Sequence, residues 1–104
     1  MKLKLFLAAI CVFALSTGAT SFAQSAGDVY KMRCQMCHGA DGKGDTVVGK
    51  KTGARDFHGP EVTKEPDSEL FTITKTGKNK MPPYAGKLTD DQIKELVIYC
   101  RSLK

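Results

Sequence analysis

Two cysteines and a histidine lie close together in the chain, at Cys34, Cys37 and His38, and form the pattern C-x-x-C-H. This pattern is typical of the attachment site of a c-type haem. The two intervening residues allow both sulfur atoms to reach the vinyl-bearing edges of one porphyrin and form thioether bonds. His38 follows directly, so it is held beneath the iron and can offer an imidazole nitrogen as the proximal ligand. The spacing therefore predicts one covalently attached haem c, bound by Cys34 and Cys37, with His38 as a ligand of its iron.

Two other kinds of site use the same residue types. A zinc site would need a second pair of ligands, and the remaining Cys100 and His58 do not form a pair in the sequence. A thiol–disulfide exchange site also uses C-x-x-C, but it usually lies beside a β-α-β pattern, which the sequence does not show. Haem attachment is therefore the favoured interpretation.

The iron of such a haem has a sixth position, and Met81 is the best candidate to fill it. Met81 lies in the K-M-P-P-Y segment of residues 80–84, where paired prolines stiffen an extended loop and remove donors that a helix needs. Met32 lies in the first helix and Met36 between the two cysteines, so neither easily reaches the opposite face of the ring. His58 is the rival ligand, but we favour a surface or hydrogen-bonded histidine there. We therefore predict Met81 as the second metal ligand.

The first 23 residues have the features of an export signal. Lys2 and Lys4 precede an apolar run over residues 5–15, and the S-F-A segment at 21–23 places small side chains where a signal peptidase recognises them. A retained membrane anchor is the alternative, but a span needs about 20 apolar residues and this run is shorter. We expect cleavage after residue 23, export to the periplasm and a mature monohaem domain of residues 24–104.

The composition limits what this domain can do. A chain of 104 residues, 41% hydrophobic and 26% charged, fits one domain and leaves no room for a catalytic domain beside a binding domain. The net charge is +5, and it is +3 without the first 23 residues, which hold two lysines and no acid. No basic cluster is interleaved with aromatic residues, so nucleic acid is a poor candidate partner. A mature chain of this size has a marginal apolar core, which a cofactor is expected to supplement.

Three cysteines remain after signal cleavage, because Cys11 leaves with the signal: Cys34, Cys37 and Cys100. An odd number argues against a plain disulfide framework in an exported chain. Cys100 lies on the apolar face of the last predicted helix. We interpret it as a small buried hydrophobic residue, with an intermolecular disulfide as the alternative.

Clear helical patterns lie at the two ends of the mature chain. The first predicted helix covers about 27–33 and ends near the C-x-x-C-H pattern, and a glycine-rich loop over 39–45 follows it. The last helix begins at a capping box formed by Thr89 and Gln92. Its apolar residues share one face, which must pack against another element: Ile93, Leu96, Val97, Cys100 and Leu103.

The chain between these helices has weaker patterns. Residues 47–65 show no sustained period and are punctuated by glycines and a proline, so we expect irregular chain there. Asp67 can cap a helix that ends at Gly77. Residues 71–74 also alternate as a strand would, but a helix is favoured.

Together these features resemble the small class I cytochromes c of bacterial periplasms, over nearly all of the mature chain. The matching segments are C-x-x-C-H with the following G-A-D-G-K-G, the Leu70-Phe71 pair, K-M-P-P-Y, and a terminal helix bearing Leu96 and Tyr99. The resemblance implies an all-α cytochrome c fold, with three to four short helices packed around one covalently bound haem. It also implies that Tyr30 packs on the last helix, where Ala26 and Gly27 supply a small contact surface.

The ligands point to electron transfer. A His/Met pair raises the reduction potential relative to two harder ligands, and burial of the haem acts in the same direction. Because both axial positions are filled, no open site is left for dioxygen or peroxide, so we predict a carrier and no enzyme. The expected protein is a soluble monomer that shuttles single electrons between periplasmic or membrane-bound redox proteins. The alternative is a haem-binding gas sensor or accessory subunit, in which Met81 is a labile ligand.

Basic residues lie near the haem by the family pattern. Four lysines could steer the protein to acidic patches on redox partners, although a solvated lysine-rich surface explains them equally well: Lys43, Lys78, Lys80 and Lys87. No tryptophan is available to bond a haem propionate, and four residues are candidates for that contact: Lys50, Lys51, Arg55 and Tyr84.

Overall fold

The computed structural model describes residues 24–104. The predicted signal peptide and Cys11 lie outside the described residues. In this part of the chain there is no strand, and the only β-type pairing is in two isolated bridges, Lys78 with Met81 and Ala85 with Leu88. The helices are α1 (Ala26–Arg33), α2 (Gln35–His38), α3 (Val47–Thr52), α4 (Pro60–Thr63), α5 (Asp67–Thr76) and α6 (Asp90–Ser102).

The all-α class is confirmed, with more helices than the three to four expected. Within residues 24–104 the structure has six, because α2, α3 and α4 add short turns of four to six residues to the longer α1, α5 and α6. Such short helices are marginal by themselves, so their tertiary contacts must hold them.

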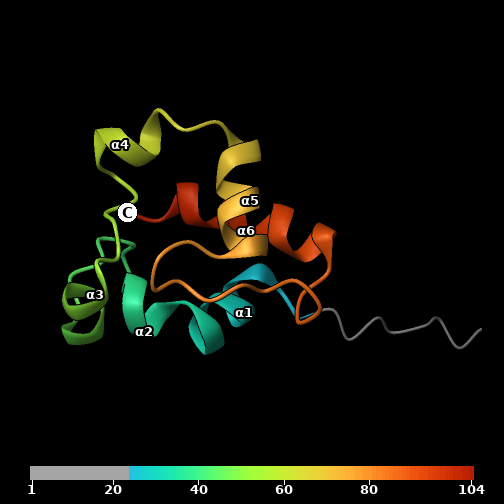
Figure 1. Ribbon diagram of the computed structural model, residues 1–104, viewed down its shortest axis with the longest axis horizontal. Helices are drawn as coiled ribbons and strands as arrows, with labels where there is room; N and C mark the ends of the chain where they lie inside the picture. Colours follow the sequence, from blue (N-terminus) through green and yellow to red (C-terminus); the bar gives the residue numbers. More distant parts are fainter. Residues whose placement is uncertain (1–23) are drawn as a thin grey trace, which may run out of the picture.

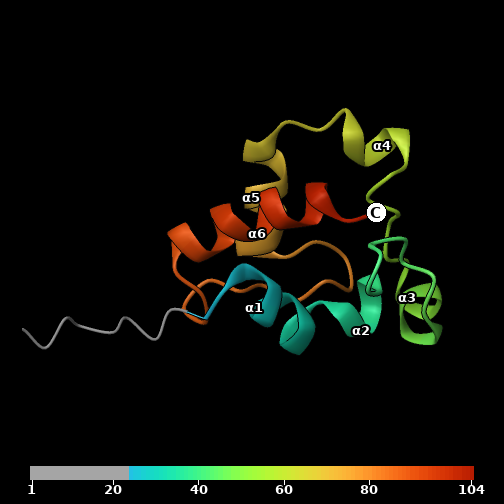
Figure 2. The same cartoon turned by 180° about the vertical axis from the view of Figure 1, so that it is seen from behind.

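Helix α6 is the central element of the fold, and both α1 and α5 pack against it (Figures 1 and 2). The predicted capping box is confirmed: Thr89 Oγ1 accepts from the Gln92 backbone N–H over 3.1 Å, and Gln92 Oε1 accepts from the Thr89 N–H over 2.8 Å. The predicted apolar face turns inward, with Ile93 fully buried and Cys100 partly buried against the core.

The predicted contact between the first and last helices is also confirmed. Tyr30 is 1% exposed, and its ring centroid lies 5.2 Å from that of Tyr99. A Cβ added at Gly27 would lie 3.4 Å from the Tyr99 ring, so the glycine lets the two helices approach closely. The Tyr30 hydroxyl donates to the Gly39 carbonyl over 2.5 Å, which joins α1 to the loop after the C-x-x-C-H pattern.

The expectation of irregular chain over residues 47–65 was wrong, because α3 and α4 lie there. The residues at the ends of these helices explain where they begin and end. Thr46 caps α3 by accepting from the Gly49 N–H, and α3 ends at Gly53, which has a φ of 78°. Pro60 is the first residue of α4, a position that suits its fixed φ. Helices of one or two turns are too short to show a hydrophobic period, which is why the pattern missed them.

The predicted helix over Asp67 to Gly77 is confirmed as α5, but its expected cap was wrong. Pro66 is the residue at the cap position, and Asp67 is the first residue of the helix. The Asp67 carboxylate instead accepts from Nε of Arg101 over 2.6 Å. This bond ties the start of α5 to the end of α6.

Candidate functional site

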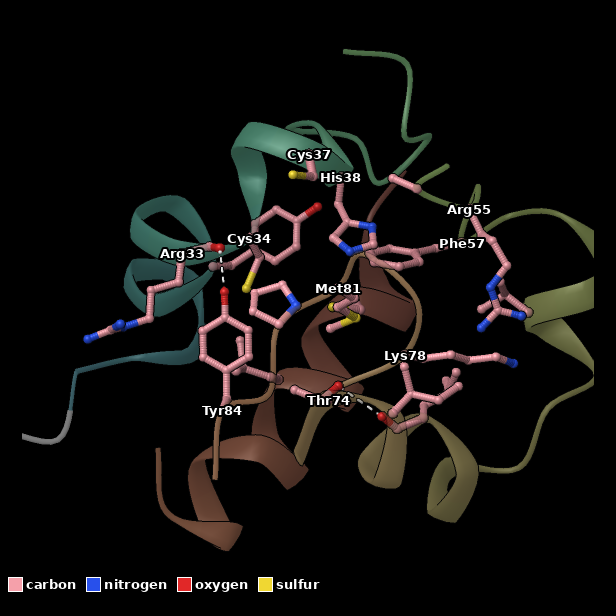
Figure 3. A pocket seen from close by; sticks show the side chains of 18 of the residues that line it. Arg33, Cys34, Cys37, His38, Arg55, Phe57, Thr74, Lys78, Met81 and Tyr84 are labelled. Atoms are coloured by element: carbon pink, nitrogen blue, oxygen red, sulfur yellow. Dashed lines mark hydrogen bonds between the residues drawn. The ribbon is translucent and has the colours of Figure 1, made fainter. Parts of the chain in front are cut away.

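One pocket of about 570 Å³ lies between α2, the loop over residues 77–88 and α6, within the range of roughly 300–1,000 Å³ typical of cofactor sites. All four residues predicted from the sequence line it: Cys34, Cys37, His38 and Met81. Figure 3 shows that Cys34, Cys37 and His38 lie on one side, with the Met81 side chain below the His38 imidazole. The fold thus brings Met81 to the three residues of the C-x-x-C-H pattern.

The C-x-x-C-H turn is held in place by α3. The Thr46 hydroxyl donates to the carbonyls of Met36 and Cys37, over 2.7 and 3.0 Å, and accepts from the Gly49 N–H over 2.8 Å. Gly49 is buried where the Cys37 carbonyl approaches, and a Cβ there would overlap the carbonyl oxygen. One hydroxyl and one missing side chain therefore fix the backbone of α2.

The His38 imidazole is enclosed, and its surroundings favour the neutral form. Its ring stacks on Phe57, with centroids 4.7 Å apart and planes 25° apart. Its Nδ1 atom is buried and has no hydrogen-bond partner. Burial, assisted by the positive charge of Arg55, lowers the pKa of His38, and the neutral imidazole is the form that binds metals.

Phe57 reaches His38 because Gly42 makes room for it. The Phe57 N–H donates to the Gly42 carbonyl over 2.9 Å. Gly42 has a φ of 76°, and a Cβ there would lie 2.7 Å from the Phe57 ring. A side chain at this position would therefore be strained and would push Phe57 away from the imidazole.

Met81 sits in a tight turn of the 77–88 loop. The Met81 N–H donates to the Lys78 carbonyl over 2.9 Å, and the Lys78 N–H donates to the Met81 carbonyl over 3.2 Å. Asn79 takes a φ of 53° within the turn. Gly77 has a φ of 78°, and a Cβ there would lie 2.7 Å from the Met81 carbonyl oxygen. These contacts fix the backbone that carries the thioether.

Tyr84 fastens this loop to the helices. It is 8% exposed, and its hydroxyl donates to the Arg33 carbonyl over 3.0 Å. Its N–H donates to the Thr74 carbonyl over 3.1 Å. Figure 3 shows Tyr84 and Thr74 at the pocket. Burial raises the pKa of Tyr84, so its hydroxyl stays a donor at neutral pH. These hydrogen bonds therefore join the Met81 loop to the end of α1 and the end of α5.

Comparison with known proteins decides the family. Residues 22–99 match the family described as cytochrome C oxidase, cbb3-type, subunit III. The chain belongs to the small monohaem c-type cytochromes. Cytochrome c6 from Thermostichus vulcanus is 32% identical to this cytochrome over 93 residues, which cover 88% of this chain and 80% of the relative. The cbb3-type oxidase subunit FixP of Rhizobium meliloti is 32% identical over 81 residues, 77% of this chain and 27% of FixP.

Solved structures agree with this assignment. The structure of the KustC0563 c-type cytochrome matches with a TM-score of 0.70 and 33% identity, and the match covers 77% of this cytochrome and 98% of that chain. The fold is therefore the cytochrome c fold. The family consists of electron carriers, so this cytochrome is an electron-transfer protein and not an enzyme, and membership implies a covalently bound haem c.

The side chains of the pocket fit that group. The thiols of Cys34 and Cys37, the His38 imidazole and the Met81 thioether are among the groups that line this pocket, and groups of these kinds attach and ligate a haem c. None of the helices within residues 24–104 is long and apolar enough to cross a membrane. The same residues include no group of three or more His, Cys, Asp or Glu side chains placed to hold a metal ion.

The rival ligands are less well placed than Met81. Met32 and Met36 also line the pocket, but they are 64% and 74% exposed, whereas Met81 is partly buried. His58 does not line the pocket of this cytochrome; its Nε2 atom lies 2.7 Å from the Asp41 carbonyl oxygen, on an exposed side chain. The arrangement favours Met81 as the second ligand.

The four predicted lysines fall into two groups. Lys78 and Lys80 line the pocket, and the Lys80 ammonium donates to the Lys51 carbonyl over 3.5 Å. Lys43 and Lys87 are exposed but do not line the pocket. Only the first two therefore lie at the pocket.

Sequence reasoning missed the residues that support the predicted site residues. Phe57 stacks on His38, and Thr46 holds the Cys37 carbonyl, yet neither belongs to a repeating pattern or a known motif. The one indication in the sequence is the abundance of glycines nearby, of which Gly42 and Gly49 are needed for close approach.

Cys100 lines the pocket from α6 and packs against the core. Burial raises the pKa of its thiol to about 12, so the thiol is neutral at physiological pH. This supports our interpretation of Cys100 as a small buried hydrophobic residue, in preference to an intermolecular disulfide.

We expect the free energy of unfolding of the haem-loaded cytochrome to fall in alkaline solution, and Cys100→Ala to remove part of that fall. An unfolded cysteine has a pKa near 8.5, whereas the folded pKa of Cys100 is about 12. Between these values the unfolded chain binds fewer protons, so stability decreases with rising pH by up to about 1.4 kcal/mol per pH unit. Burial also raises the pKa of Tyr30, so only the difference between parent and variant isolates the thiol.

Urea unfolding of both proteins at about pH 7 and about pH 10 measures this difference, because the slope with pH reports proton binding. Equal losses of stability in the parent and in Cys100→Ala would contradict a buried thiol at this position.

Proposed function

We propose that this cytochrome is a diffusible one-electron carrier whose haem c is attached through Cys34 and Cys37 and ligated by His38 and Met81. The observation that carries the proposal is the convergence of these four side chains on one pocket, although Met81 is far from the others in the sequence. When bound, the haem supplies an iron that cycles between two oxidation states.

The chain's own residues tune and protect this site. His38 offers a neutral imidazole that Phe57 holds in place, and Met81 offers a thioether, which disfavours the oxidised iron relative to a harder ligand. Tyr84 holds the loop that carries Met81 closed against α1. With His38 and Met81 both serving as ligands, a bound iron would have no open position for a substrate, which suits transfer of an electron.

We further propose that residues 1–23 are a signal peptide that is removed during export, so that the mature cytochrome acts in the periplasm. The apolar run over residues 5–15 after Lys2 and Lys4 supports this proposal.

The proposed partners are redox proteins with acidic docking surfaces, which the cytochrome meets as a monomer. Lys78 and Lys80 supply positive charge at the pocket, while Met32 and Met36 expose apolar side chains beside it. A positive rim of this kind speeds association with acidic partners, and rates then fall as salt is added.

The proposed function predicts one covalently bound haem per mature chain. The full chain is to be expressed with cytochrome c maturation factors, and the exported product analysed by mass spectrometry and by absorption in both oxidation states. We expect the mass of residues 24–104 plus one haem, a sharp α band after reduction and a weak near-infrared sulfur-to-iron band after oxidation. A bare polypeptide made under these conditions would contradict the proposal.

A further inference from the structure

The residues that line the pocket carry an excess of positive charge. Five are basic and one is acidic: Arg33, Arg55, Lys78, Lys80, Arg101 and Glu61. Two of these cations already have carboxylate partners outside the pocket, Arg55 in Glu65 and Arg101 in Asp67. The remaining excess of positive charge would attract an anionic group in the pocket. A haem carries two propionate carboxylates, which are groups of the required charge.

Arg55 is held more firmly than an ordinary surface cation. Its guanidinium donates to both carboxylate oxygens of Glu65, over 2.7 and 3.1 Å. The two side chains are 32% and 21% exposed, so water screens the pair only in part. A bidentate pair fixes the direction and the plane of the guanidinium. Glu65 is not a lining residue of the pocket, so it anchors Arg55 from outside.

Three other candidates for a propionate contact are engaged or absent from the pocket. Lys50 does not line the pocket; it pairs with Asp45 on the surface, where the side chains are 70% and 69% exposed. Lys51 does not line the pocket. The hydroxyl of Tyr84 donates to a backbone carbonyl at the end of α1. Lys78, by contrast, lines the pocket and makes no ion pair with any residue in the described part of the chain.

The charge of Arg55 also reaches the proximal side of the site. Arg55 lines the same pocket as His38 and its stacking partner Phe57. Figure 3 shows Arg55 and Lys78 on the same side of the pocket, with Phe57 between Arg55 and the His38 imidazole. A fixed positive charge at this edge of the pocket would disfavour the more positive, oxidised state of an iron bound to that imidazole.

We propose that Glu65 is a positioning residue that holds Arg55 at this edge of the pocket, where Arg55 and Lys78 bind the carboxylates of the haem propionates. This inference rests on the proposed function, because it takes the haem to be attached at Cys34 and Cys37. Arg55 then raises the reduction potential of the iron. Glu65 acts by keeping the guanidinium in place, since its own negative charge would shift the potential in the opposite direction.

The test is a double-mutant cycle on the reduction potential. Redox titration is to be carried out on haem-loaded parent, R55Q, E65Q and R55Q/E65Q proteins. We expect R55Q to lower the potential. We expect E65Q to lower the potential in the parent, because Arg55 loses the residue that holds it in place. In the R55Q background Arg55 is already absent, so E65Q removes only the negative charge of Glu65 and should not lower the potential. The cycle isolates coupling between the two residues.

The sign of this coupling decides the proposal. A shift on E65Q that is more negative in the parent than in the R55Q background supports it. Equal shifts, or a more positive shift in the parent, overturn it. D45N is the matched control, because it also removes one carboxylate from an ion pair, at an exposed site away from the pocket, and it should leave the potential unchanged. E65D, which keeps the carboxylate, should restore most of the parent value.

The haem content separates this proposal from the proposed function. A parent protein without one covalently attached haem contradicts the proposed function itself. If all four proteins carry the haem and the near-infrared band but the shifts in reduction potential are additive, only the role of Glu65 is contradicted.

Discussion

Replacing Met81 by alanine is expected to lower the reduction potential by on the order of 0.1 V or more, within the ~0.8 V range over which axial ligands shift haem potentials. The near-infrared band should disappear from the oxidised spectrum, because the thioether that gives rise to it is gone. The reduced protein should bind carbon monoxide rapidly. Truncation of a partly buried methionine should also reduce the free energy of unfolding by about 2 kcal/mol or more. Redox titration, absorption spectra and urea unfolding measure these effects.

Met36→Ala is the matched control for this variant. It removes the same side chain from a residue that is 74% exposed beside the pocket, so the band, the potential and the stability should stay close to the parent values. His58→Ala should behave in the same way, since His58 bonds the Asp41 carbonyl on the surface. Loss of the band in either control, with the band retained in Met81→Ala, would place the sixth ligand elsewhere.

The rate of carbon monoxide binding to the reduced parent separates the carrier from the gas-sensing alternative. Gly77, the Lys78–Met81 bonds and Tyr84 all restrain the loop that carries the thioether. A restrained ligand competes well with an incoming gas, so the reduced parent should bind carbon monoxide slowly. Rapid binding by the parent would mean that Met81 is labile and would favour a sensor or accessory role.

The parts of this site that the sequence predicts are those with local chemical or periodic causes. Cys34, Cys37 and His38 are fixed by the spacing that thioether attachment requires, and α6 by a capping box followed by a helical repeat. Met81 could be predicted as a candidate ligand because prolines at 82 and 83 exclude a helix there, and it lines the pocket. Each of these causes operates within a few residues of chain.

The remaining parts depend on contacts between distant segments. The bidentate pair of Arg55 and Glu65 spans α4 and has no pattern of its own. Phe57 is indistinguishable in the sequence from an ordinary core aromatic, and only the fold places it on His38. Helix α3 forms around Gly49, a residue of poor helix propensity, because its neighbours require a residue without a side chain.

Gly49→Ala should destabilise the haem-loaded cytochrome by about 3 kcal/mol, the upper part of the range for overpacking a filled site. Helix propensity alone predicts the opposite sign, since alanine is favoured over glycine in a helix by roughly 1 kcal/mol. Steric overlap decides the outcome. A Cβ at Gly49 would overlap the Cys37 carbonyl oxygen and would lie 2.6 Å from the Gly44 carbonyl oxygen and 2.9 Å from Thr46 Oγ1. Two of these atoms belong to backbone, which cannot rotate away.

The variant should also lower the fraction of chains that carry haem, because relief of the overlap displaces Cys37. Gly53→Ala is the control in the same segment: Gly53 has a φ of 78°, but a Cβ there would meet nothing within 4 Å. It should cost only the strain of a left-handed residue, roughly 1–2 kcal/mol, with normal haem attachment. Urea unfolding and mass spectrometry measure both effects. A Gly49→Ala protein as stable as the parent would mean that α2 and α3 can separate without loss, and that α3 does not hold the attachment turn in place.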